Sequence, residues 1–226
     1  MKTTEVIVVG GGLAGLSAAM KLCEKGCRVK LVSVTKVRRS HSVCAQGGIN
    51  VSVNLKGEDD SPLIHAYDTI KGGDFLANQP PILEMCLTAP AILRMLDRMG
   101  CPFNRTMEGT IDFRRFGGTL YHRTAFCGAS TGQQLLYSLD EQVRRYEAKG
   151  MVEKFENHEF LRLILDAEGR ARGIILHDLY NLDLHVMKAD AVVIATGGLG
   201  LIYKKSTNST FCTGAANGRL YMQGMK

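Results

Sequence analysis

Three glycines near the start of the chain have the spacing of a phosphate-binding loop, Gly10-x-Gly12-x-x-Gly15. Gly10 permits a tight turn, Gly12 lets backbone N–H groups approach a diphosphate, and Gly15 lets a helix pack closely on the preceding strand. The N-terminus of that helix adds a partial positive charge that attracts phosphate. The spacing therefore predicts that this part of the chain binds a dinucleotide.

The segments around these glycines are the ones that such a loop requires. Residues 6–9 form an apolar, β-branched run typical of a buried parallel strand, residues 13–25 have the periodicity of a helix, and residues 28–34 alternate like a second strand. Glycine turns are common, so this β-α-β order is what makes the interpretation specific. NAD-binding domains usually hold the ribose with an acid at the end of the second strand. Ser33 stands there instead, which weakens a plain NAD interpretation but still offers a hydroxyl to the ribose.

The rest of the chain alternates between helical and β-type patterns. Residues 34–60 lack a period and are expected to form a long functional loop. Helices are predicted from the Ser61-Pro62 start signal and at residues 81–87, 90–99 and 131–149. Short turns separate three β-type runs, which predict an antiparallel meander, at residues 160–165, 173–179 and 182–187. A last buried strand is predicted at residues 191–195, and residues 213–226 begin a further helix.

This order of elements resembles the FAD domain of the glutathione-reductase type, an α/β fold with a parallel sheet and a three-stranded β-meander. We expect one FAD-binding domain over residues 1–226, with a helical insertion at 49–150 and the meander at 158–188. The small residues Ala195, Thr196 and Gly197 end the last strand and would let the backbone approach the cofactor.

Composition excludes several classes of protein. The net charge of +6 is mild and the basic residues are scattered, so we expect no nucleic-acid binding. The seven cysteines include no C-x-x-C pair, so reduced thiols are expected and no metal or iron–sulfur site. We expect no signal peptide, because the segment before the first predicted strand is short and lacks a long apolar stretch, and no apolar run has membrane-spanning length.

The loop after the second strand carries a closer resemblance. It contains the step Ser40-His41 and then Ala45-Gln46-Gly47-Gly48. Taken alone, His41 is most simply a solvent-facing loop histidine. Together with later motifs, however, the loop resembles the flavoprotein subunits of succinate dehydrogenase and fumarate reductase, in the bacterial branch with a single di-haem membrane anchor. Those motifs, spread over essentially the whole chain, are Gly72-Gly73-Asp74, Phe113-Arg114-Arg115-Phe116-Gly117-Gly118, His122-Arg123-Thr124, Thr131-Gly132-Gln133-Gln134 and Ala195-Thr196-Gly197-Gly198.

The resemblance implies a cofactor and its ligands. In this family the histidine of the Ser-His step is joined to the 8α carbon of FAD, which assigns the covalent link to His41. Ser33 is the residue that the family carries at that position, and Gly47 and Phe116 match positions that line the dicarboxylate site. The cofactor-binding residues implied in this sequence are Gly10, Gly11, Gly12, Leu13, Ala14, Gly15, Ser33, Lys36, Ser40, His41, Ala45, Gln46, Gly47, Gly48, Ala195, Thr196 and Gly197.

The resemblance also implies an assembly and a reaction. The complete enzyme would oxidise succinate to fumarate and pass electrons through an iron–sulfur subunit and a di-haem membrane anchor to quinone, at the cytoplasmic face of the cell membrane as a peripheral subunit. The family's acid–base residues and its capping domain lie in later segments, so the chain is expected to stop before them and to contain no catalytic residue. The alternatives are a quinol:fumarate reductase flavoprotein, L-aspartate oxidase, which lacks the linking histidine, and a catalytically incomplete flavin-binding fragment.

Overall fold

The computed structural model describes residues 3–225, and these fall into two compact units. The first unit contains residues 3–44 and 139–225, and the second contains residues 45–138. Helix α4 (Thr131–Ala148) begins in the second unit and ends in the first. The expected helix at the end of the sequence is α5 (Ala215–Met222), and its predicted last residue, Lys226, lies outside the described range.

The first unit is built on a parallel sheet with the strand order β10-β1-β2-β6. Its strands are β1 (Glu5–Val9), β2 (Arg28–Ser33), β6 (Val152–Glu156) and β10 (Ala191–Ile194). Strand β1 lies at the centre, where Val8 is in register with Leu31 on one side and Val193 on the other. The predicted β-α-β unit is therefore present, with α1 (Leu13–Glu24) as its crossover helix.

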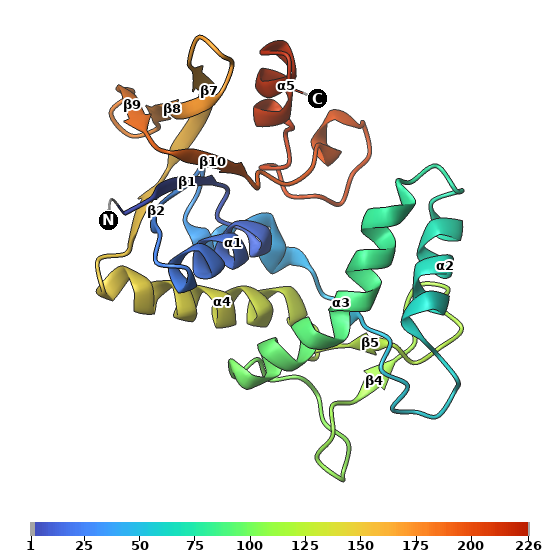
Figure 1. Ribbon diagram of the computed structural model, residues 1–226. Coiled ribbons are helices and arrows are strands. Elements are labelled where there is room, and N and C mark those ends of the chain that lie inside the picture. The colour runs from blue at the N-terminus through green and yellow to red at the C-terminus, as the bar shows by residue number, and fades with distance from the viewer. Residues whose placement is uncertain (1–2, 226) are drawn as a thin grey trace. The chain divides into compact units, whose positions relative to one another are not determined.

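A second layer of the first unit is the antiparallel sheet β7 (His158–Leu165), β8 (Ala171–Asp178) and β9 (Leu184–Lys188). Side chains alternate between the two faces of β1. Ile7 and Val9 pack into one core with Phe160, Leu163, Ile174 and Leu176 of the meander. Val8 points the other way, toward Gly15 of α1. The parallel sheet thus lies between the meander and α1 (Figure 1), which confirms the predicted fold class.

Two parts of the chain differ from the predictions. Strand β6 was not predicted, because three of the five residues in its sequence Val-Glu-Lys-Phe-Glu are charged and only Val152 is fully buried. The expected loop over residues 34–60 contains two short 3-10 turns, η1 (Val37–Arg39) and η2 (His41–Cys44), followed by the two-residue strand β3 (Ile49–Asn50). A third such turn, η3 (Gly200–Ile202), follows β10.

The second unit contains helices α2 (Pro62–Gly72) and α3 (Gln79–Arg98) and the small sheet β3-β5-β4, with β4 at Phe113–Arg114 and β5 at Thr124–Ala125. Helix α2 begins as predicted, with the Ser61 hydroxyl accepting the Ile64 N–H. The prediction of two helices divided at Pro90 was wrong, because α3 runs through this proline. Burial of Cys86, Leu93 and Leu96 along one face of the helix offsets the hydrogen bond that proline cannot make.

A buried arginine is paired with two carboxylates in the second unit. The Arg123 side chain is 1 % exposed and its Nη2 lies 2.7 Å from Asp60 Oδ1 and 2.9 Å from Asp68 Oδ2. Asp60 is itself 4 % exposed, so loss of the guanidinium would leave a carboxylate buried without its partner.

Candidate functional site

A cavity of about 580 Å³ opens in the first unit where β1, β2 and β10 end. The carboxyl ends of parallel strands meet at this edge, which is the usual ligand site of such sheets. Eleven of the predicted cofactor-binding residues line this cavity, and Gly15 lies outside it. The eleven are Gly10, Gly11, Gly12, Leu13, Ala14, Ser33, Ser40, His41, Ala195, Thr196 and Gly197.

Close packing explains why glycine is required at two positions of the loop. Gly10 has φ +123°, and a Cβ there would lie 2.1 Å from the carbonyl oxygen of Ala195. A Cβ on Gly15 would lie 1.7 Å from the carbonyl oxygen of Gly10. Both contacts are with backbone, which has little freedom to move. Gly10 and Gly15 therefore shape the loop, and Gly15 does so from outside the cavity.

Gly12 is different, because the atoms nearest to it belong to side chains and not to the backbone. A Cβ there would meet only the Ser42 Oγ at 3.2 Å and the Ser40 Oγ at 4.0 Å. Gly12 is the N-cap of α1 and offers no side-chain cap, and the first turn of the helix carries no acidic residue. This helix N-terminus faces the cavity with its partial positive charge available to an anion.

One hydroxyl of the cavity wall supports a polar ligand. Ser40 is buried, and its Oγ has no hydrogen-bond partner within the described residues. A buried hydroxyl without a partner costs free energy unless a ligand or water binds it. Beside it, the Ser42 Oγ accepts the Leu13 N–H at 3.2 Å. The glycine loop, the helix N-terminus and Ser40 together fit the diphosphate of a dinucleotide.

Ser33 ends β2 in the cavity wall and is buried. A Cβ on Gly11 would lie 2.7 Å from the Ser33 Oγ, so this hydroxyl approaches the glycine loop itself. Its position at the end of the second strand is the one where a ribose hydroxyl is usually bound. The side chain is neutral, and a hydroxyl can both donate and accept a hydrogen bond.

His41 reaches the same cavity from η2. Its Nδ1 accepts the backbone N–H of Ser209 at 3.1 Å. Because a backbone N–H can only donate, Nδ1 carries a lone pair and the proton of the neutral imidazole is on Nε2. The tautomer of the ring is thereby defined, and Nε2 is the nitrogen left for a ligand.

The other predicted site residues lie elsewhere. Lys36 is exposed and is the N-cap of η1, outside the cavity lining. Ala45, Gln46, Gly47 and Gly48 belong to the second unit.

Within that second unit, the structure brings the two predicted substrate-lining residues together. A Cβ on Gly47 would lie 2.6 Å from the Phe116 ring, so a side chain at position 47 would displace this ring. Arg114 Nε donates to the Gly47 carbonyl at 3.2 Å, and its guanidinium lies 5.9 Å from the centre of the Phe116 ring.

Several cavity residues were missed from the sequence. The wall is completed by residues 211–217, by Arg219 and by His158, Glu159 and Phe160 at the start of β7. The Thr196 hydroxyl donates to Asn217 Oδ1 at 3.2 Å, which ties the end of β10 to α5. Residues 211–217 and Arg219 reach the cavity because the chain returns to it after β10, whereas His158, Glu159 and Phe160 reach it from the start of β7. None of them was predicted from the sequence as a cofactor ligand.

A cluster of possible metal ligands lies at one end of the meander. The ligand atoms of His158, Asp178 and His185 all lie within 4.8 Å of one another. His158 Nε2 is 3.7 Å from Asp178 Oδ2, and His158 Nδ1 bonds to the carbonyl oxygen of Glu156 at 2.8 Å. These residue types can bind Zn²⁺. Sequence spacing gave no signal for the cluster, because its members come from three strands, and the expected lack of a metal stays a prediction.

A glycine loop at a helix N-terminus, at the carboxyl edge of a parallel sheet, defines a dinucleotide-binding protein. The family described as "FAD binding domain" matches residues 5–226. The chain therefore belongs to this family, and its cofactor is FAD.

Individual known proteins show which members of this family the chain is similar to. It is 59 % identical over 224 residues to the succinate dehydrogenase flavoprotein subunit of Bacillus subtilis, covering 99 % of this chain and 38 % of that protein. It is 33 % identical to the fumarate reductase flavoprotein subunit of Serratia, covering 98 % of this chain and 36 % of that protein. The Sdh1 complex of Mycobacterium smegmatis matches with a TM-score of 0.90 at 31 % identity, covering 96 % of this chain and 38 % of that chain. The chain thus spans less than two-fifths of the length of these relatives.

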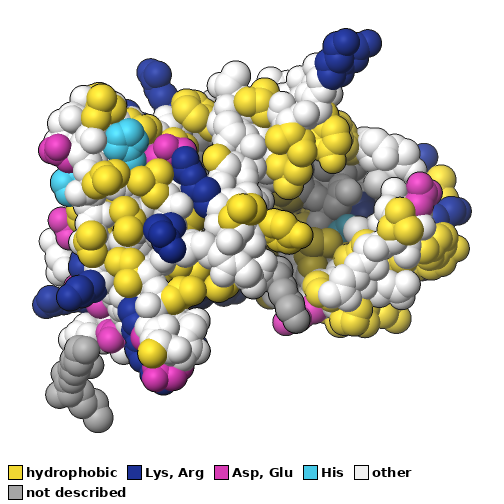
Figure 2. Space-filling view, turned by 90° about the horizontal axis from the view of Figure 1, so that it is seen from above, with side chains coloured by type: hydrophobic (Ala, Val, Ile, Leu, Met, Phe, Trp, Pro, Cys, Tyr) yellow, Lys and Arg dark blue, Asp and Glu magenta, His cyan; other side chains and the backbone are white. Residues whose placement is uncertain are grey.

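Two surface properties complete the description. Among residues 3–225, none of the helices combines the length and the hydropathy that crossing a bilayer requires. Lys and Arg side chains are scattered among hydrophobic and uncharged ones on the face shown in Figure 2.

Proposed function

We propose that this chain is the FAD-binding N-terminal part of the flavoprotein subunit of a succinate:quinone oxidoreductase. The observation that carries the proposal is the presence of His41 in the wall of the cavity that the glycine loop forms. The 59 % identity with a succinate dehydrogenase flavoprotein supports the assignment to this enzyme. When bound, FAD supplies the acceptor for the hydride of succinate and releases the electrons one at a time.

The residues of the chain divide the work of holding FAD. The N-terminus of α1, with Gly10, Gly11 and Gly12, would bind the diphosphate, and the Ser33 hydroxyl would bind a ribose. The strand end at Ala195, Thr196 and Gly197 would let the backbone approach the cofactor. Lys36 and the loop Ala45-Gln46-Gly47-Gly48 remain predicted cofactor ligands on the sequence resemblance alone.

His41 would form a covalent bond to the 8α carbon of FAD. The Ser209 N–H occupies Nδ1, so the bond is expected at Nε2. In this bond the 8α carbon would take the place of the Nε2 proton of His41, and FAD, when bound, would itself accept the two electrons of the C–H bond that breaks. In the product Nδ1 keeps its lone pair, so the hydrogen bond from Ser209 survives the reaction.

The whole enzyme would need partners. Its electrons would leave through an iron–sulfur subunit and a di-haem membrane anchor to quinone, with the flavoprotein peripheral at the cytoplasmic face of the membrane. Gly47 and Phe116 would line the succinate/fumarate site, and the catalytic residues would lie in parts of the subunit that this chain does not cover. Operation as a quinol:fumarate reductase is the second candidate, because fumarate reductase flavoproteins are also relatives of this chain.

In-gel flavin fluorescence of the acid-precipitated, full-length subunit tests this function. We expect fluorescence at the position of the wild-type polypeptide and none in His41→Ser. His41→Ser should still bind FAD non-covalently, lose succinate oxidation and retain some fumarate reduction, because unlinked flavin is the weaker oxidant. His177→Ser is the matched control, since His177 lies in β8 outside the cavity lining. Release of all flavin from the wild-type protein would refute the bond and favour L-aspartate oxidase.

A further inference from the structure

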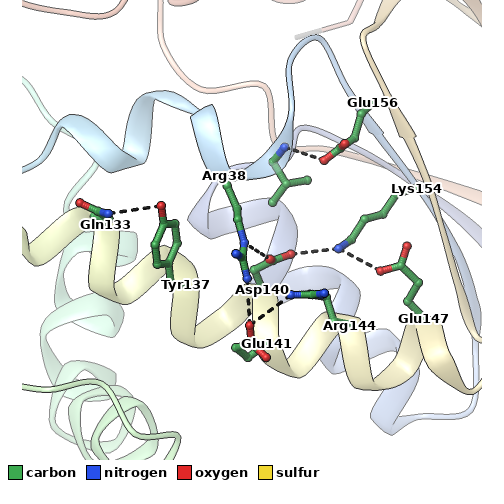
Figure 3. A network of polar contacts seen from close by, with 10 residues as sticks. Arg38, Gln133, Tyr137, Asp140, Glu141, Arg144, Glu147, Lys154 and Glu156 are labelled. Atoms are coloured by element: carbon green, nitrogen blue, oxygen red, sulfur yellow. Dashed lines mark hydrogen bonds and ion pairs between the residues drawn. The ribbon is translucent and has the colours of Figure 1, made fainter.

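The turn that precedes His41 is held by a network of charged side chains, all in the first unit (Figure 3). Arg38 Nε donates to Asp140 Oδ2 at 2.8 Å, and Lys154 Nζ donates to Asp140 Oδ1 at 2.9 Å. Both oxygens of one carboxylate are therefore bound by cations. The Asp140 side chain is 4 % exposed, so this bridge is shielded from water.

A second carboxylate fixes the same turn from the neighbouring strand. Glu156 Oε1 accepts the backbone N–H of Val37 at 2.8 Å. Glu156 and Lys154 are two residues apart on β6 and so point to the same side of the strand. Strand β6 thus reaches the turn twice, once directly through Glu156 and once through Lys154 and Asp140.

The distance along the chain from this network to His41 is short. Ser40 N–H donates to the Val37 carbonyl at 3.1 Å, and Val43 N–H donates to the Ser40 carbonyl at 3.1 Å. The two 3-10 turns are therefore joined through Ser40, and a displacement of Arg38 would move the backbone of His41 as well.

We propose that Asp140 is a positioning residue for His41: by bridging Arg38 and Lys154 it holds the turn Val37–Arg39 so that the His41 imidazole faces the cofactor cavity. This proposal rests on the proposed function and names a residue that acts on the linking histidine through the backbone. Charged hydrogen bonds in a buried site have a narrow geometry. Burial alone would raise the pKa of Asp140, but the hydrogen bonds from Arg38 and Lys154 lower it, so the carboxylate is charged at neutral pH.

The chain offers a matched control. Glu141 follows Asp140 on α4 and also accepts from Arg38, with its Oε1 at 2.9 Å from Nη2. Its side chain is 59 % exposed, so water can replace this bond at little cost. Asp140→Asn and Glu141→Gln each neutralise one carboxylate partner of Arg38, and only the first breaks the buried bridge.

The test uses the full-length subunit, with total FAD and acid-stable FAD measured separately over time after FAD is added to the apoprotein. A misplacement of about 1 Å can slow a reaction by roughly 100-fold, so we expect covalent attachment in Asp140→Asn to slow by about 10- to 100-fold. Total FAD should be unchanged, because the glycine loop is intact. Glu141→Gln should attach FAD at the wild-type rate. Arg38→Lys keeps the positive charge but cannot bond to Asp140 and Glu141 through two separate nitrogens, as Arg38 does through Nε and Nη2. Covalent attachment should be slowed in this variant as well.

Three outcomes would overturn the proposal. Normal attachment in folded Asp140→Asn would show that the bridge does not position His41. An equal loss of total and covalent FAD in both Asp140→Asn and Arg38→Lys would show a structural role only. Wild-type protein without covalent FAD would refute the link itself, and with it both this proposal and the proposed function.

Discussion

The glycine loop allows a clean separation of cofactor binding from folding. We predict that Gly12→Val removes FAD and leaves the fold intact, whereas Gly15→Ala destabilises the fold. At Gly12, which lines the cavity, the nearest atom to a new Cβ is the Ser42 Oγ at 3.2 Å, and this side chain has to move by only a few tenths of an ångström to make room. At Gly15 the nearest atom is a backbone oxygen at 1.7 Å.

Gly15→Ala should lower stability whether or not FAD is present, whereas the effect of Gly12→Val should depend on FAD. Ordinary contact begins at 3.4 Å, so a Cβ on Gly15 is 1.7 Å too close and the strand–helix pair must separate. Overpacking of this kind costs about 1–3 kcal/mol, or roughly 2–12 °C in Tm for a chain of this size. Gly12→Val should differ in stability from the wild type only when FAD is present. Bound FAD then stabilises the wild-type protein by about 2.7 kcal/mol at a ligand concentration of 100 Kd, and the variant does not gain this stability.

Thermal unfolding with and without added FAD separates these cases, and the flavin absorbance of the purified protein measures retention. Without FAD, Gly12→Val should melt with the wild type and Gly15→Ala should melt lower. With FAD, the wild type should gain Tm and Gly12→Val should not. Full flavin content in Gly12→Val would mean that the diphosphate is not bound at this helix N-terminus, and the reasoning from the loop would fail.

Three further predictions concern stability and thiol reactivity. Arg123→Leu should lower the free energy of unfolding by about 3–5 kcal/mol in urea titrations, because it leaves Asp60 buried and unpaired; a loss under 1 kcal/mol would contradict this. Pro90→Ala should raise that free energy by about 1–3 kcal/mol, since it restores a hydrogen bond inside α3; no gain would mean that the helix is already relaxed around proline. Burial raises the pKa of Cys101 to about 12, so native alkylation at pH 8 should spare it and label Cys44, which is exposed. The same protection should extend to Cys23, Cys86 and Cys127, because burial also raises the pKa of these thiols.

Local patterns predicted much of the first unit. The strand, glycine loop and helix at the start of the chain are encoded by residues close together in sequence, and so are the three runs of the meander. Strand β6 could not be found in this way, because its alternating charges serve the network around Asp140 rather than a buried face. Helix α3 shows the opposite case, since packing of its buried face within the second unit overrides the break that Pro90 predicts.

The candidate site was predictable only where a motif marks it. The glycines, Ser33, Ser40 and His41 could be named from the loop sequences, and they line one cavity. Ser209, which defines the tautomer of His41, is 168 positions away in sequence. Neither spacing nor composition connects two such residues, so only the fold could reveal that the imidazole has one nitrogen occupied.

The charges around the cavity explain why Ser33 can replace the acid that many dinucleotide-binding domains have at the end of the second strand. Among the described residues that line it, the one carboxylate is Glu159, and its Oε1 is paired with Arg219 Nη1 at 2.7 Å. Glu156 lies opposite Ser33 in the sheet, but its Oε1 is bound to the Val37 N–H at 2.8 Å. A diphosphate at the N-terminus of α1 would therefore meet a helix dipole and neutral hydroxyls, with the nearby carboxylates already compensated. An acid at position 33 would add an unpaired negative charge to the buried wall of the cavity. This charge would be costly to bury and would weaken the binding of an anionic cofactor.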